Sequence, residues 1–241
     1  HFCTKYLDQN TINELLNEEE RPDEWEQVIK HVDKLSRVIK EVVKRYYQGH
    51  QSLAYNLLRK QIETSLQIAC VIPKNLNWYR MRCANSNLHL NYQDMFHIPL
   101  NMRGIVKTER YSFPGYPCLY LGSTIYDCWE ELHRPSLNSA YVSRVCNTSR
   151  LIMLDMTIPD LNGWLDVDGK KRLQIELPRL PLIIASMIKV KNSNDVFKPE
   201  YIIPQLLMEL VLKQQNKSIV QYSGIYYSSV CENQDFNFRG E

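Results

Sequence analysis

The sequence predicts an α+β protein with an α-helical N-terminal region, residues 1–72, followed by a second domain, residues 73–241. Between Pro22 and Pro73 there is no proline and only one glycine, Gly49, which is typical of long helices. All but two of the eleven prolines lie beyond Pro73, among short β-branched and aromatic runs typical of strands joined by turns. A few helical segments interrupt these runs without βαβ regularity, and this mixture indicates the α+β class.

Two helices are expected in the N-terminal region. Asp23 is the expected N-cap of the first helix, and Gly49 is expected to end it. Apolar residues at spacings of three and four give this helix one buried face: Val28, Val32, Leu35, Ile39, Val42 and Tyr46. Ser52 is expected to cap a second helix, whose inward residues are Leu53, Leu57, Ile62 and Leu66.

The second domain is expected to contain a mixed set of strands and helices. Four runs have the composition of strands: residues 118–122, 140–145, 150–156 and 218–228. One helix is expected at about 124–133, after a cap at Ser123 or Thr124. Another is expected at about 199–215, where Pro199 stands near the first turn and Pro204 can delay the start.

Composition narrows the class of protein. The net charge of +2 is too small to indicate nucleic-acid binding. The longest apolar run, residues 180–188, is too short to cross a bilayer, which needs about 20 residues, and no signal peptide is recognised. The seven cysteines include no CxxC pair, which favours free thiols without a metal site. We therefore expect a cytoplasmic protein that binds neither nucleic acid nor a membrane.

Residues 110–132, RYSFPGYPCLYLGSTIYDCWEEL, contain the densest group of candidate functional side chains. The proline and glycine entry is expected to deliver a strand that presents Tyr120, and the following helix returns Glu130 and Glu131 toward the same place. Taken singly, Tyr120 is more typical of a partly buried strand aromatic and Glu131 of a solvated helix acid than of a functional site. The signatures of dinucleotide oxidoreductases, P-loop enzymes, serine hydrolases and zinc proteases are absent from the sequence.

Three segments in order resemble the RES-domain family, which is named for its Arg, Glu and Ser: YRMR at 79–82, residues 110–132, and GIYYSS at 224–229. The family pattern is Tyr-Arg, then Gly-Arg-Trp-x-x-x-Gly-x-Pro-x-x-Tyr, then a Glu eleven residues beyond that Tyr, and a late Ser. The resemblance covers about residues 75–230. It places the family's four named functional positions on Arg80, Tyr120, Glu131 and Ser228.

Two further positions follow from the same alignment. Arg110 and Tyr111 fall on the Arg-Trp positions of the pattern, so Tyr111 replaces the usual Trp, and Glu109 replaces the usual Gly. A shift of one residue would exchange Ser228 for Ser229, or Glu131 for Glu130, although the spacing from Tyr120 favours Glu131.

The resemblance implies an ADP-ribosyltransferase-like fold, with a mixed sheet core and flanking helices. Such proteins take NAD as a substrate, need no other cofactor, and break its nicotinamide–ribose bond. They act as toxins of toxin–antitoxin or anti-phage defence systems, with water, phosphate or a protein as the acceptor. An antitoxin or regulatory protein on the helical N-terminal region, or a second copy of the chain, are the implied protein partners.

The chemistry of these residues suits that reaction. Nicotinamide leaves as a neutral base, so one carboxylate, Glu131, is sufficient to stabilise the ribosyl cation. Arg80 can bind the pyrophosphate through its guanidinium, and Tyr120 can pack on the nicotinamide ring. Ser228 completes the polar contacts, with Arg110 and Tyr111 in support. Two alternatives remain: transfer of ADP-ribose to a protein, and a binding or regulatory module without catalysis.

Overall fold

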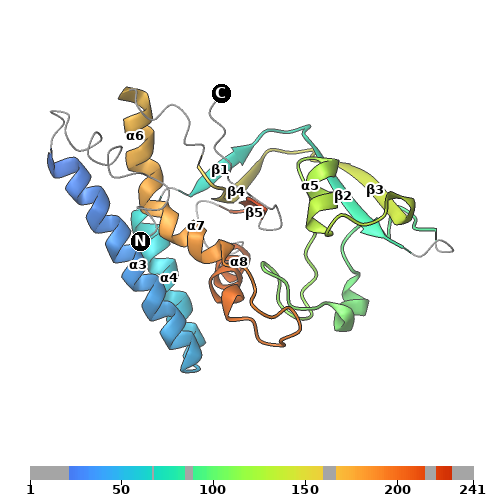
Figure 1. The fold of residues 1–241 in the computed structure, drawn as a ribbon, viewed down its shortest axis with the longest axis horizontal. Coiled ribbons are helices and arrows are strands. Elements are labelled where there is room, and N and C mark those ends of the chain that lie inside the picture. The colour runs from blue at the N-terminus through green and yellow to red at the C-terminus, as the bar shows by residue number, and fades with distance from the viewer. Residues whose placement is uncertain (1–21, 67, 85–88, 160–166, 215–220, 230–241) are drawn as a thin grey trace. The chain divides into compact units, whose positions relative to one another are not determined.

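The structure is a computed structural model that describes residues 22–66, 68–84, 89–159, 167–214 and 221–229 (Figure 1). The chain forms two compact units. The helical unit contains residues 1–67 and 158–183, and the mixed unit contains residues 68–157 and 184–241. The α+β class and the helical character of the N-terminal region are confirmed.

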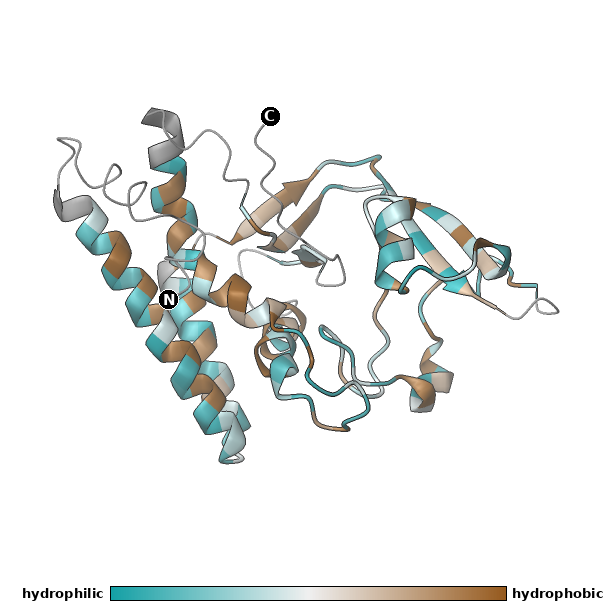
Figure 2. Cartoon of the chain, viewed as in Figure 1, coloured by the Kyte–Doolittle hydropathy of each residue, from teal (hydrophilic) through white to brown (hydrophobic). Residues whose placement is uncertain are grey.

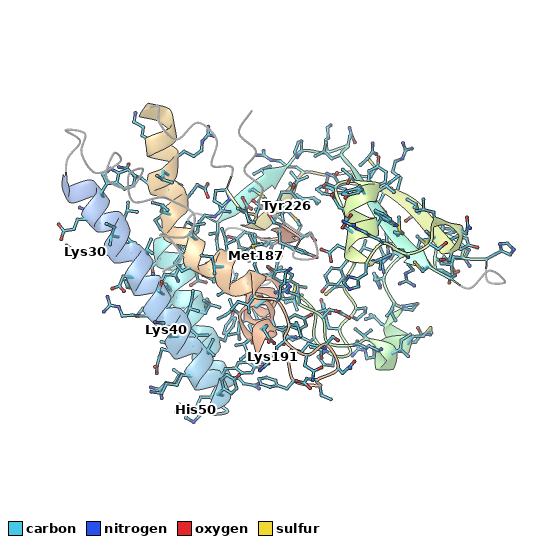
Figure 3. The ribbon with its side chains drawn as sticks, viewed as in Figure 1. Lys30, Lys40, His50, Met187, Lys191 and Tyr226 are labelled. Atoms are coloured by element: carbon cyan, nitrogen blue, oxygen red, sulfur yellow. The ribbon has the colours of Figure 1, made fainter. Side chains whose placement is uncertain are left out.

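The helical unit is built on α3 (Pro22–Tyr47) and α4 (Gln51–Ser65), which pack side by side (Figure 1). The predicted face of α3 is confirmed, since Leu35 and Val42 are fully buried. Figure 2 shows this face as brown patches that alternate with teal along the helix. Lys30 projects from the exposed face (Figure 3), where it pairs with Glu26 at 2.7 Å.

The turn between α3 and α4 is closed by Gly49, as expected. Gly49 has a φ of +81°, a left-handed conformation that glycine adopts without steric cost. The amide of Gly49 donates to the Tyr46 carbonyl at 3.0 Å, and the amide of His50 donates to the Arg45 carbonyl at 3.0 Å. These two bonds form a Schellman motif that satisfies the last carbonyls of α3.

Two details predicted for these helices are wrong. Asp23 lies inside α3, which begins at Pro22, so Asp23 is not the N-cap; proline suits the first helical turn. Ser52 does not cap α4, because the Schellman turn starts this helix at Gln51 with His50 before it. The buried stripe of α4 agrees with the prediction only in part: Ile62 is buried as expected, Leu57 and Leu66 are half-buried, and Leu53 is 43% exposed. The stripe consists of Ala54, Tyr55, Leu58, Gln61 and Ile62.

The remaining described elements of the helical unit follow the mixed unit's fourth strand in the chain. They are α6 (Val167–Glu176), η3 (Leu177–Arg179) and the beginning of α7 (Leu180–Met187). The 3₁₀ turn η3 packs against α3. Arg179 is buried there and pairs with Glu176 at 3.2 Å. None of these elements is predicted from the sequence.

The described residues of the mixed unit form five strands in two sheets (Figure 1). In the first sheet, β4 (Leu151–Met156) pairs antiparallel with β1 (Ala69–Ile72) and parallel with β5 (Gly224–Tyr227). In the second, β2 (Asn77–Cys83) pairs antiparallel with β3 (Ala140–Cys146). The two antiparallel pairs keep one register, so they form a long ribbon that is interrupted after Pro73, which has no amide hydrogen for the ladder.

Asn147 holds the interruption of this ribbon together. Its side-chain oxygen accepts from the Leu76 amide at 3.1 Å and from the Trp78 indole at 3.3 Å. Its amide nitrogen donates to the carbonyls of Pro73 and Ser149, each at 2.8 Å. The ribbon therefore stays continuous through the break and carries β2 to the candidate site described below.

The strand predictions for the mixed unit have different outcomes. The strands at 140–145 and 150–156 are confirmed as β3 and β4. Of the run 218–228, residues 224–227 form β5, and residues 218–220 lie outside the described part. The strand at 118–122 is wrong: the segment is extended but makes only an isolated bridge between Gly122 and Tyr79, because Pro117 and the turn before it limit its pairing. β1 and β2 were not predicted.

The helices of the mixed unit agree more closely with the sequence. The predicted helix at 124–133 is α5 (Ile125–Glu131), and the one at 199–215 is η4 (Pro199–Tyr201) continued by α8 (Ile202–Gln214). Pro204 lies in the first turn of α8, where its missing amide hydrogen is not needed. The short turns η1 (Leu100–Ile105) and η2 (Leu137–Ser139) complete the unit.

The core of the mixed unit lies around α8, which contacts β5. The buried side chains of α8 are Ile202, Ile203, Pro204, Leu206, Leu207, Leu210 and Val211. Across the described ranges, no helix has the length and apolar character needed to span a membrane.

Candidate functional site

Arg80 lies at the middle of β2 and is half-buried. Its Nη1 donates to the Tyr120 carbonyl at 3.0 Å, while its Nε is buried and has no hydrogen-bond partner in the described residues. Burial, and to a lesser extent the charge of Arg82, lower the pKa of Arg80 to about 10, against a small opposing effect of Cys128. The guanidinium remains a cation at pH 7, and its buried Nε donor is unused among the described residues.

Tyr120 stands beside Arg80 in the extended segment that precedes α5. Its hydroxyl is buried and has no hydrogen-bond partner among the described residues. Burial raises its pKa above the usual range; the Ser112 side chain lies nearby and opposes this rise, although the two hydroxyls do not form a hydrogen bond. Buried polar atoms are rarely left unpaired, so Arg80 Nε and Tyr120 Oη both mark a place where a ligand can supply partners.

A second pair of tyrosines extends this group. The rings of Tyr111 and Tyr227 lie 4.7 Å apart between centroids, at an angle of 45°. Burial raises the pKa of Tyr111 to about 12. Burial also raises the pKa of Tyr227 well above its usual range, and the charge of Glu131 is the next largest cause, followed by Tyr120 and Tyr111. Glu131 therefore lies close to Tyr227, which in turn lies close to Tyr120 and Tyr111; we call these three residues the tyrosine cluster (Tyr111, Tyr120 and Tyr227).

Glu131 is the last residue of α5 and is exposed. The hydroxyl of Ser229 donates to Glu131 Oε1 at 2.5 Å. This bond joins the end of α5 to the segment after β5, which are 98 residues apart in the chain. Ser229 was the alternative to Ser228 in the sequence alignment, and it is the serine with this contact.

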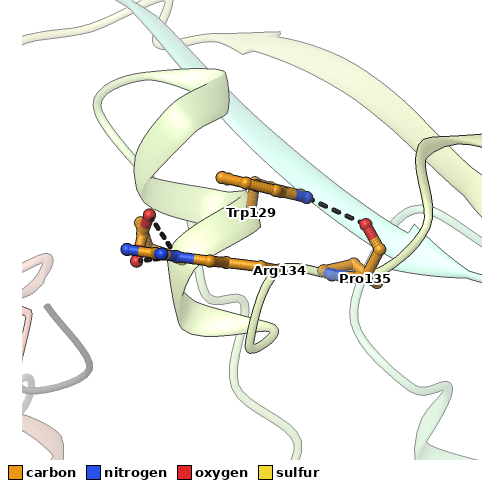
Figure 4. A network of polar contacts seen from close by, with 4 residues as sticks. Trp129, Arg134 and Pro135 are labelled. Carbon is orange, nitrogen blue, oxygen red and sulfur yellow. Dashed lines mark hydrogen bonds and ion pairs between the residues drawn. The ribbon is translucent and has the colours of Figure 1, made fainter. Parts of the chain in front are cut away.

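Glu130 has a different environment from Glu131. It is only 4% exposed, and Arg134 Nε donates to its two carboxylate oxygens at 2.9 and 3.0 Å (Figure 4). Hydrogen bonds from Tyr126 and Arg134 lower the pKa of Glu130. Because its carboxylate is already occupied by these partners, Glu130 is not available to a substrate in the way that Glu131 is.

The same network fixes the end of α5. The Trp129 indole donates to the Pro135 carbonyl at 2.9 Å, and the Arg134 guanidinium lies over the Trp129 ring at 5.7 Å from its centroid (Figure 4). His133 and Arg134 both have positive φ, 59° and 56°, which turns the chain sharply after the helix. The network holds this turn and so orients the last helical residue, Glu131.

The beginning of α5 is held by a capping box. The Thr124 hydroxyl accepts from the Asp127 amide at 3.0 Å, and the Asp127 carboxylate accepts from the Thr124 amide at 2.8 Å. Of the two caps that the sequence allows, the structure uses Thr124. This arrangement satisfies two of the free donors at the start of a helix.

Replacing Thr124 by alanine is expected to lower the free energy of unfolding by about 1 kcal/mol, the usual contribution of an N-cap side chain. Urea denaturation of the full chain, followed by tryptophan fluorescence, measures the change. Thr124→Ser is the control, because it keeps the accepting oxygen and should stay near wild type. Equal stability of the alanine and serine variants would contradict the assigned cap.

The Arg110 side chain binds other residues of the protein. Its Nη1 donates to the Ser186 carbonyl at 2.5 Å and to the Ile188 carbonyl at 3.1 Å, at the C-terminal end of α7. Its guanidinium also lies 5.3 Å from the centroid of the Tyr201 ring. These contacts anchor the turn that carries Tyr111, and Gln205 of α8 holds the same turn by donating to the Ser112 carbonyl at 3.2 Å.

The cysteines near the site have the environment of thiols rather than thiolates. Burial raises the pKa of Cys118 to about 11 and also raises that of Cys128, whose thiol donates to the Tyr79 carbonyl at 3.2 Å. A raised pKa disfavours the nucleophilic thiolate. Within the described residues, no group of three or more His, Cys, Asp or Glu side chains has the arrangement of a metal site.

The structure thus brings residues from four distant segments together in the mixed unit. Arg80 meets Tyr120 through a hydrogen bond, Glu131 meets Ser229 likewise, and Tyr227 lies near Glu131 and Tyr120. The sequence analysis missed Tyr227, although its place between Gly224 and Ser229 in the GIYYSS motif could have indicated it. The role of Ser228 in the site stays a prediction.

Comparison with known proteins gives one relative. No protein-family model matches the chain, and no solved structure matches it significantly. The chain is 34% identical over 227 residues to a protein of Bacillus subtilis (strain 168) named "Putative toxin YopC". The match covers 83% of this chain and 49% of that protein, so the chain spans about half the length of the relative.

Proposed function

We propose that the chain cleaves the nicotinamide–ribose bond of NAD and acts as a toxin. The observation that carries the proposal is the exposed carboxylate of Glu131, held by Ser229 beside the tyrosine cluster. Arg80 adds a cation with an unused buried donor in the same unit. The name of the Bacillus subtilis relative supports the toxin role, and the resemblance to the RES-domain family supports NAD as the substrate.

Each residue has a role that its surroundings allow. The Arg80 guanidinium binds a phosphate group of NAD, because guanidinium and phosphate oxygens match in geometry and charge. Tyr120 packs on the nicotinamide ring. Glu131 accepts a hydrogen bond from the ribose and stabilises the positive charge that develops on the sugar. Ser229 orients Glu131, whereas Arg110 acts through the Tyr111 turn. We assign these roles to an ADP-ribosyltransferase-like fold.

The reaction needs no general acid. The bond between the ribose C1′ and the nicotinamide nitrogen breaks, and its electron pair leaves with the nitrogen, which becomes neutral. In hydrolysis, water adds its oxygen to C1′ and releases one proton, giving ADP-ribose. Phosphate in place of water would give the phosphorylated product. A single carboxylate is sufficient for this chemistry, and of the two glutamates at the end of α5, Glu131 is the exposed one.

Nicotinamide release tests the proposal directly. The purified chain is incubated with NAD in buffer, in buffer with phosphate, and with cell lysate; nicotinamide and the ADP-ribosyl product are then identified by chromatography and mass spectrometry. The expected result is that nicotinamide and one ADP-ribosyl product form in equal amounts. The incubation in which nicotinamide is released fastest identifies the acceptor. If wild type releases no more nicotinamide than Glu131→Ala in every arm, the enzymatic proposal fails.

Toxicity tests the biological part of the proposal. Induced expression of the wild-type chain in bacteria is expected to stop growth and lower cellular NAD, whereas Glu131→Ala should do neither. An antitoxin or regulatory protein that binds the helical unit would then restore growth when expressed together with the chain. Growth arrest by both chains at constant NAD would instead indicate a protein that acts by binding.

A further inference from the structure

Ser143 on β3 lies directly opposite Arg80 on β2 in the antiparallel ladder. Side chains of directly opposed residues point to the same face of a sheet, with Cβ atoms about 4.5–5.5 Å apart. The Ser143 Oγ is buried and, like Arg80 Nε, has no hydrogen-bond partner in the part of the chain that the structure describes. Two residues that each carry a buried donor without a partner therefore stand opposite each other in the ladder.

The surroundings of this pair are positive. Trp78, Arg80 and Arg82 alternate with the other residues of β2 and so share one face of the strand. The positive charge of Arg82 lowers the pKa of Arg80. Among the described residues, no carboxylate forms an ion pair with Arg80. The Trp78 ring on the same face contacts the ring of Tyr226 of β5, with the two centroids 6.1 Å apart. The Arg80 cation thus lacks a counter-ion within the described protein.

The position of the Arg80 fork limits what can bind. One of its nitrogens, Nη1, is held by the Tyr120 carbonyl on the side of the 118–122 segment, and Ser143 lies on the other side of β2, toward β3. A ligand that satisfies both Arg80 Nε and Ser143 Oγ must accept two hydrogen bonds and carry negative charge. A phosphate group meets both needs, since it has several acceptor oxygens and pairs strongly with guanidinium.

We propose that Arg80 and Ser143 together bind one phosphate group, and that Ser143 is a binding residue for the substrate. The identification of this phosphate with the diphosphate of NAD rests on the proposed function. A free phosphate ion that serves as acceptor has the same chemistry and is the other source. The RES motif positions do not include Ser143, because the recognition motif lies on β2, the 110–132 segment and the C-terminal GIYYSS motif.

Ligand binding to variants tests the site without depending on turnover. Calorimetry with ADP-ribose, and separately with inorganic phosphate, compares wild type with Ser143→Ala. We expect Ser143→Ala to weaken binding about 10-fold, the usual effect of one hydrogen bond to a charged group. Arg80→Lys keeps the charge but loses the planar fork, so a weakening of about 10-fold or more is expected. Ser149→Ala, an exposed serine on the β3–β4 connection, is the matched control and should bind as wild type does.

Thermal unfolding separates this role from a structural one. Removing a buried hydroxyl that has no partner relieves an unsatisfied polar group, so Ser143→Ala without ligand should be at least as stable as wild type. Adding ADP-ribose should raise the melting temperature of wild type more than that of Ser143→Ala. Loss of binding without loss of stability is the expected signature of a ligand contact.

The outcomes distinguish this proposal from the proposed function. If Ser143→Ala binds ADP-ribose more weakly than wild type does, the bound phosphate belongs to the dinucleotide. If Ser143→Ala binds only inorganic phosphate more weakly, the bound phosphate is the acceptor. Either result supports phosphate binding by Arg80 and Ser143, even if no nicotinamide is released. Equal affinity of wild type and Ser143→Ala for both probes, or no saturable binding of either probe to wild type, overturns it. Nicotinamide release by wild type would then leave the proposed function standing.

Discussion

Replacing Glu131 by glutamine is expected to lower the rate of nicotinamide release about 100- to 1,000-fold, the range observed when a group that stabilises transition-state charge is removed. Glutamine has the same shape and can keep a hydrogen bond to Ser229, so the change removes the negative charge and little else. Because the charge acts mainly on the developing ribosyl cation, kcat should fall far more than the KM for NAD rises.

The two neighbouring glutamates give this prediction its sharpest control. Glu130→Gln weakens the pair with Arg134 and leaves Glu131 in place, so it should reduce activity much less and should lower thermal stability instead. Glu209→Gln, on the surface of α8, should change neither activity nor stability. A large loss of activity in Glu130→Gln together with normal activity in Glu131→Gln would show that the alignment is wrong by one residue.

The elements that the sequence predicted well are those set by local signals. Thr124 caps α5 and Gly49 ends α3 through interactions within a few residues, and the buried stripe of α3 follows from the local spacing of its apolar residues. The strand predicted at 118–122 is wrong, because the composition of a strand does not supply a pairing partner. Only Gly122 pairs with β2, and the rest of the segment is held through the Tyr120 carbonyl by Arg80, which lies 40 residues earlier in the chain.

The long-range part of the candidate site was beyond local patterns for the same reason. Ser143 reads as an ordinary strand serine, and its importance depends on the β2–β3 register, which sets it opposite Arg80. Likewise, nothing near Ser229 in the sequence distinguishes it from Ser228; the hydrogen bond to Glu131, across 98 residues, does so. The order of the motifs in the sequence indicates most of the segments that form the candidate site. Strand pairing across the sheet then decides which of their side chains can act together.

Gly122 lies between Tyr120 and the start of α5, and it pairs with Tyr79 of β2. Replacing Gly122 by alanine is expected to lower the free energy of unfolding by about 3 kcal/mol, the upper range for overpacking a core. A Cβ at this position would lie 2.7 Å from Cys128 Sγ and 3.0 Å from the Thr124 carbonyl oxygen. Cys128 has little room to yield, since it is buried and its thiol is bonded to the Tyr79 carbonyl. In a chain of this length, the loss corresponds to about 6–12 °C in melting temperature.

Three variants make the Gly122 result specific. Gly104→Ala is the matched control and should stay within about 0.5 kcal/mol of wild type, because nothing lies within 4 Å of a Cβ there. In Gly122→Ala combined with Cys128→Ala, the closest clash is gone, so the double variant should lose less stability than the two single changes added together. Additive losses would show that the contact with Cys128 is not the cause.

Gly122→Ala should also affect activity. Gly122 lies between Tyr120 and α5, so a shift at this position should change the distance between Tyr120 and Glu131. The fraction of Gly122→Ala that remains folded should therefore release nicotinamide more slowly than wild type.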